Sequence, residues 1–72
     1  MKQNLYFQHS DGSYTLLLEN CTENEAWRKA DEFMSEHNFK CYYIRSWKDN
    51  EQNTWWDVGS HTEFFAWGFL NI

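Results

Sequence analysis

Three side chains in the C-terminal third of the sequence have the types needed for acid–base catalysis. Asp57, His61 and Glu63 lie close together in the chain, and a histidine oriented by a carboxylate can act as a general base. The same residues also have a structural explanation, because Asp57 can pair with Arg45 while Glu63 caps a turn. Catalysis requires a geometry that closeness in sequence does not supply. We therefore favour the structural explanation and predict that the protein is not an enzyme.

The two cysteines and three histidines are the candidate soft metal ligands. Structural zinc sites usually contain close pairs such as C-x-x-C or H-x-x-x-H, and no such pair occurs among Cys21, Cys41 and the histidines at 9, 37 and 61. We predict no metal and no cofactor. Two cysteines are also too few for a secreted disulfide framework, so we expect reduced thiols and a cytoplasmic location, with a Cys21–Cys41 bridge as the alternative. Cys21 precedes a predicted helix, whose positive end could slightly activate the thiol.

The charge balance argues against nucleic acid as a partner, and the lack of a long apolar run argues against a membrane span. Among 72 residues, 11 are acidic and 6 are basic, which gives a net charge of −5. Nucleic-acid binding usually requires clustered Lys and Arg, but the basic residues here are scattered between Lys2 and Lys48. Two alternatives remain: aromatic rings could stack on single-stranded bases, and acidic Glu23, Glu32 and Glu36 could imitate a phosphate backbone. No apolar run approaches the roughly 18 residues of a membrane span.

Aromatic residues account for 21% of the chain, and most of them lie between Phe39 and Phe69. A chain of this length buries only about 60% of its unfolded surface. Large rings offset this, because each buries about 150–250 Å². We predict a single domain over residues 1–72, stabilised mainly by aromatic packing.

The clearest local signal is a helix from Glu23 to His37. Thr22 and Glu25 have the spacing of a capping box, in which each side chain accepts a hydrogen bond from the backbone of the other. Apolar residues then recur at helical spacing on one face; they are Ala26, Trp27, Ala30, Phe33 and Met34.

Two hairpins are predicted on either side of this helix. Residues 13–19 alternate as a strand after the Asp11-Gly12 turn, and residues 4–8 form either a second strand or an arm. Phe39 to Trp47 and Thr54 to Val58 form the other hairpin across a five-residue loop. Its register places Arg45 opposite Asp57 and Trp47 opposite Trp55. For residues 61–67 we expect a helical turn, because Ser60 and Glu63 resemble a capping box, with a further strand as the alternative.

These elements predict an α+β fold in which one amphipathic helix packs on a three- or four-stranded, mostly antiparallel sheet. Tyr42, Ile44, Trp56 and Val58 should face the helix. The opposite face would be bare and rich in the residue types of binding hot spots. We expect a second copy to cover it in a homodimer; the predicted interface residues are Tyr43, Arg45, Trp47, Trp55, Asp57, Phe64, Phe65 and Trp67.

Two segments of the sequence, 11–15 (DGSYT) and 54–65 (TWWDVGSHTEFF), resemble small uncharacterised proteins of Gram-positive phages and prophages, in particular the YopT family of Bacillus prophage proteins. The resemblance implies a homodimer with one helix and three strands per subunit, and it supplies no catalytic residues. We therefore expect a phage accessory protein that acts as a homodimeric interaction module on a host or phage protein. The alternative is a nucleic-acid-binding or nucleic-acid-mimicking inhibitor of a host protein.

Overall fold

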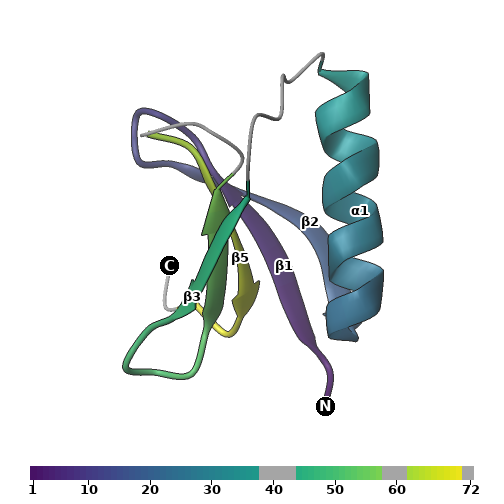
Figure 1. Cartoon of the computed structure of the whole chain (residues 1–72), viewed down its shortest axis with the longest axis vertical. Coiled ribbons are helices and arrows are strands. Elements are labelled where there is room, and N and C mark those ends of the chain that lie inside the picture. The colour runs from purple at the N-terminus through teal and green to yellow at the C-terminus, as the bar shows by residue number, and fades with distance from the viewer. Residues whose placement is uncertain (38–43, 58–61, 71–72) are drawn as a thin grey trace.

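The computed structural model describes residues 1–37, 44–57 and 62–70, in which one helix packs on a five-stranded antiparallel sheet (Figure 1). The strand order is β2-β1-β5-β4-β3. The predicted α+β class is confirmed, but the predicted number of three or four strands is wrong. The elements are β1 (Gln3–Gln8), β2 (Tyr14–Cys21), α1 (Glu23–Glu36), β3 (Arg45–Lys48), β4 (Thr54–Asp57) and β5 (Phe64–Gly68).

Helix α1 begins at the predicted capping box. The Thr22 hydroxyl accepts a hydrogen bond from the Glu25 backbone N–H at 3.2 Å, and the Glu25 carboxylate accepts one from the Thr22 N–H at 2.8 Å. Both donors would otherwise be unpaired at the start of the helix. The helix ends at Glu36, and the N–H of the next residue, His37, caps it by donating to the Phe33 carbonyl. Local sequence therefore sets both ends of this element.

The extra strand arises because β5 joins the two hairpins into one sheet. It pairs with β1 on one side and with β4 on the other, both antiparallel. The predicted helical turn at 61–67 is thus wrong where the structure describes it. Phe65 and Trp67 belong to the core cluster, whereas Phe64 contacts Trp47 on the other side of the sheet, and this alternation of side-chain direction belongs to a strand. Residues 4–8 likewise belong to a strand, β1, rather than to an arm.

The second hairpin has the predicted register. Arg45 lies opposite Asp57, Trp47 opposite Trp55 and Lys48 opposite Thr54. Strand β3 begins at Arg45, and residues 39–43 of the predicted strand lie outside the described part of the chain. Tyr42, Tyr43 and Val58 lie outside the described residues.

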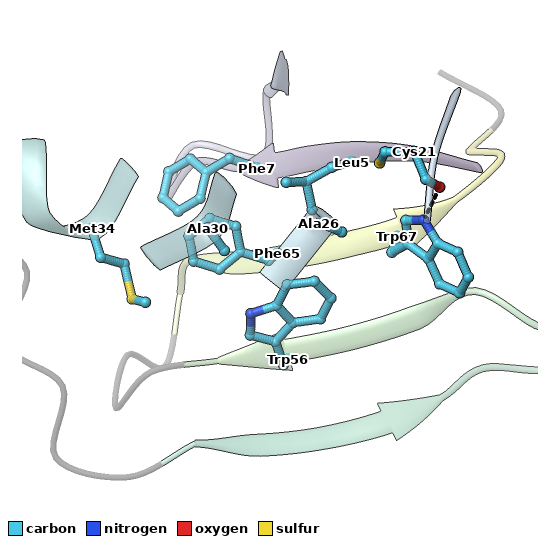
Figure 2. Packing of buried hydrophobic residues seen from close by; sticks show 9 residues of the cluster. All are labelled: Leu5, Phe7, Cys21, Ala26, Ala30, Met34, Trp56, Phe65 and Trp67. Atoms are coloured by element: carbon cyan, nitrogen blue, oxygen red, sulfur yellow. Dashed lines mark hydrogen bonds between the residues drawn. The ribbon is translucent and has the colours of Figure 1, made fainter. Parts of the chain in front are cut away.

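The core forms between α1 and one face of the sheet (Figure 2). Trp56 is fully buried and stacks on Trp27 of α1, with ring centroids 4.0 Å apart and planes at 17°. Phe65, opposite Trp56 on β5, also lies nearly parallel to its ring, with centroids 5.7 Å apart and planes at 19°. Trp56 therefore faces the helix as predicted. Ile44, which was expected on the same side, is 46% exposed, because α1 lies over β1, β2 and β5 and does not reach β3.

Candidate interaction surface

The sheet face opposite α1 carries an unbroken apolar row across all five strands. Since Trp56, Phe65 and Phe7 face the core, their chain neighbours face the other way. The pairing then sets five residues side by side, one from each strand, in the order Leu16, Tyr6, Ala66, Trp55, Trp47. We call this side the open face, because Figure 1 shows no described helix over it. It comprises the row together with Tyr14, Phe64, Arg45 and Asp57.

The open face is shielded in its middle and exposed at both ends. Ala66 is 1% exposed and Tyr6 8%, whereas Leu16 is 45% and Trp47 42% exposed. Aromatic side chains provide the shielding, since Tyr14 meets Tyr6 edge-on at 6.4 Å and Phe64 meets Trp47 at 5.9 Å. Edge-to-face contacts of this kind hold the rings in fixed positions. The apolar area left for a partner is therefore concentrated near the edge strands β2 and β3.

An ion pair lies next to this row on β3 and β4. Arg45 Nη2 lies 3.0 Å from Asp57 Oδ2, and Nε donates to the same oxygen at 3.2 Å. The Asp57 side chain is 1% exposed and that of Arg45 is 55% exposed. A carboxylate removed from water requires such a partner. Arg45 thus stabilises Asp57 and at the same time presents a cationic group at the surface.

The Asp49 carboxylate fixes the orientation of Trp55. Its Oδ2 accepts hydrogen bonds from Trp55 Nε1 at 2.8 Å and from Asn53 Nδ2 at 3.1 Å. Its Oδ1 accepts from the backbone N–H groups of Glu51 and Asn53, both at 2.9 Å. The hydrogen bond from Trp55, helped by those from Asn53 and Glu51, outweighs desolvation and lowers the pKa of Asp49 to about 2. The ionised carboxylate therefore holds the β3–β4 turn and one indole of the open face together.

This arrangement predicts a loss of stability in acid. The pKa of Asp49 is about 2 in the folded protein against 3.8 for the free side chain, so its stabilisation is complete above about pH 4 and disappears as the pH falls toward 2. Urea unfolding of the parent chain and Asp49→Asn across this range measures the effect. We expect the variant to be less stable at neutral pH and the difference to shrink in acid.

Glu36→Gln is the matched control, because it removes an exposed carboxylate at the end of α1. Its curve should run parallel to that of the parent chain through the same range. A constant difference between Asp49→Asn and the parent chain down to pH 2 would contradict the role given to Asp49.

The structure divides the predicted interface residues into two groups. Arg45, Trp47, Trp55, Asp57 and Phe64 lie on the open face. Phe65 and Trp67 lie on the opposite side, 1% and 6% exposed in the core, and the Trp67 Nε1 donates to the Cys21 carbonyl at 3.0 Å. They are therefore unavailable to a partner. Tyr43 lies outside the described residues.

Sequence reasoning did not place the N-terminal hairpin on this surface. Tyr6, Tyr14 and Leu16 belong to the open face because β1 lies beside β5. The alternation within 4–8 and 13–19 would have separated these residues from Leu5 and Phe7. It could not have shown which strand the hairpin pairs with.

Other candidate chemistry receives little support from the described residues. Asp57 is paired with Arg45, and His61 lies outside the described part of the chain. Among residues 1–37, 44–57 and 62–70, no group of three His, Cys, Asp or Glu side chains is placed to hold a metal ion. The Cys21 thiol is free and buried, and burial, with the nearby Glu25 carboxylate, raises its pKa, which is opposite to the slight activation that the helix end could give.

No protein-family model matches the chain, and no curated protein or solved structure is significantly similar to it. Within the described residues, no helix has the length and apolar character needed to cross a membrane. Inference about function therefore depends on the geometry of the open face.

Proposed function

We propose that the protein is a small, non-enzymatic interaction module that works as a homodimer and uses its open face to contact partners. The observation that carries this proposal is the apolar row from Leu16 to Trp47, which crosses all five strands on the side away from α1. An exposed apolar patch on a small protein usually marks an interaction site, and the exposed parts of this row lie at its two ends, Leu16 and Trp47. Trp, Tyr and Arg, the residues typical of binding hot spots, all occur on this face.

The resemblance to YopT-like prophage proteins supports a more specific role. It favours a phage accessory protein that binds a host or phage protein in the host cytoplasm. A homodimer suits a chain of this size, because association adds buried surface to a small core.

Replacing Trp47 by aspartate should weaken self-association. Trp47 is 42% exposed at the end of the apolar row, and a charge there would have to be desolvated on dimer formation. We expect the parent chain to be dimeric at micromolar concentration and Trp47→Asp to raise the dissociation constant by about 10- to 30-fold, the effect of losing a moderate hot spot. Sedimentation equilibrium over a range of protein concentrations measures both values.

Phe69→Asp is the matched control, because it introduces the same charge at an apolar side chain that is 65% exposed and lies beyond the end of β5. It should leave the dissociation constant nearly unchanged, and circular dichroism should show both variants folded. A parent chain that is monomeric at every concentration would rule out the homodimer.

A further inference from the structure

The two edges of the sheet differ in regularity. The pairing of β2 with β1 is interrupted by two register shifts, and Asn20 in β2 has a positive φ of 52°. Such irregularities protect an edge strand from pairing with another chain. The pairing of β3 with β4 is regular over its whole length, and all four residues of β3 are exposed. Strand β3 is therefore the edge suited to accept a further strand.

The hydrogen bonding of the β3–β4 turn shows which backbone groups of β3 face outward. The Asp49 N–H donates to the Asn53 carbonyl at 3.0 Å, while the Asn53 N–H donates to Asp49 Oδ1. The first of these bonds places Asp49 and Asn53 at the position of a hydrogen-bonded pair in the ladder. Such pairs alternate along an antiparallel ladder, which makes Trp47–Trp55 the next one. The N–H and C=O groups of Ser46 and Lys48 therefore point away from β4, toward the outer edge of the sheet, which no described strand covers.

We propose that two copies of the protein pair antiparallel through their β3 strands, with the two-fold axis at Trp47. This inference rests on the proposed homodimer and specifies how it forms. A two-fold axis perpendicular to the joined sheet places one residue opposite its own copy. At Arg45 or Lys48 this would oppose like charges, which is destabilising. At Ser46 it would set Lys48 against Ile44 and form no pair of opposite charges.

A two-fold axis at Trp47 satisfies the outward-facing backbone groups of β3 and also brings opposite charges together. Ser46 then lies opposite Lys48 of the partner subunit, and the outward-facing backbone groups of both residues form hydrogen-bonded pairs. Arg45 lies opposite Asp49 of the partner subunit, so opposite charges meet at both ends of the contact. The two Trp47 side chains face each other in a non-hydrogen-bonded pair, where cross-strand side chains approach most closely.

This pairing extends the open face across both copies. The two sheets become one, with both helices on the same side and the apolar rows joined end to end at Trp47. The contact covers the exposed Trp47 indole and leaves Trp55, Phe64 and Leu16 for the other protein. Self-association and partner binding thus use adjoining parts of the open face.

Cysteine cross-linking tests the antiparallel pairing of the two β3 strands without changing Trp47. In a Cys41→Ser background, Ser46→Cys and Lys48→Cys are prepared separately, mixed and oxidised with oxidised glutathione. Directly opposed residues in a hydrogen-bonded pair have Cα atoms about 5.5 Å apart, within disulfide range, whereas the diagonal neighbours are about 7–8 Å apart. We expect the mixture to give a disulfide-linked heterodimer, identified by intact mass. Neither variant oxidised alone should give a disulfide-linked dimer.

The other outcomes distinguish a failure of the β3 pairing from a failure of the homodimer proposal. Cross-linking of Ser46→Cys with itself would overturn the axis at Trp47 and place it at Ser46. A dimer seen by sedimentation in which no pair cross-links would overturn pairing through β3 and leave the homodimer standing. Absence of self-association in the parent chain would remove both proposals.

Ser46→Pro provides a second test that needs no oxidation. Proline removes a backbone donor that points to the outer edge of the sheet and not to β4, and proline is tolerated on edge strands for this reason. We expect Ser46→Pro to abolish the dimer while circular dichroism shows a folded chain, and Ser46→Ala to retain the dimer. Equal dimerisation of the two folded variants would overturn the proposal.

Discussion

Truncation of Trp56 to alanine is expected to lower the free energy of unfolding by about 3–5 kcal/mol. The side chain is 0% exposed and stacks with both Trp27 of α1 and Phe65 of β5, so its removal leaves a cavity at the contact between the helix and the sheet. A chain of this length is stable by only about 4–11 kcal/mol. The variant should therefore retain little or none of its free energy of unfolding. Urea unfolding at a fixed protein concentration, followed by far-UV circular dichroism, measures the loss.

Trp47→Ala is the control for this prediction, because it removes the same side chain from a position that is 42% exposed. It should reduce the free energy of unfolding by less than about 1.5 kcal/mol. Trp56→Phe should also be milder than Trp56→Ala, since the indole Nε1 has no hydrogen-bond partner within the described structure. Equal effects of Trp56→Ala and Trp47→Ala would contradict the placement of the core.

Replacement of Gly68 by alanine is expected to reduce the free energy of unfolding by about 1–3 kcal/mol. A Cβ at this position would overlap the Asn53 side chain. That side chain is buried and cannot move freely, since its Oδ1 accepts from the Phe69 N–H at 3.0 Å and its Nδ2 donates to Asp49. The added methyl group would therefore separate the β3–β4 turn from the end of β5. Urea unfolding measures the effect.

The double variant Asn53→Ala/Gly68→Ala tests the mechanism. If the clash with Asn53 is responsible, the two substitutions should be non-additive, because Gly68→Ala should cost little once the side chain of Asn53 has been shortened. Gly12→Ala is the contrasting control. It lies in open space with a φ of +89°, so its cost comes from backbone strain alone. Additive effects of the Asn53 and Gly68 substitutions would rule out the proposed contact.

Features that depend on neighbours in the chain could be read from the sequence. The capping box of Thr22 and Glu25 and the apolar spacing from Ala26 to Met34 determine α1, because helical contacts are local. The register of β3 and β4 followed from opposite charges at Arg45 and Asp57 and from two facing indoles. Once that register was known, period-two alternation placed Trp47 and Trp55 away from the core. About half of the open face was therefore predictable.

Only the tertiary structure decided how the hairpins combine. Residues 61–67 carry both a capping-box pattern and the alternation of a strand, and pairing with β1 and β4 selects the strand over Phe64–Gly68. That choice buries Phe65 and Trp67 and brings Tyr6, Tyr14 and Leu16 onto the same surface as Trp55. It also brings Gly68 against Asn53. Local propensity determines which segments become helix or hairpin, but contacts between residues far apart in the chain determine which strand lies beside which, and hence which aromatic side chains remain for a partner.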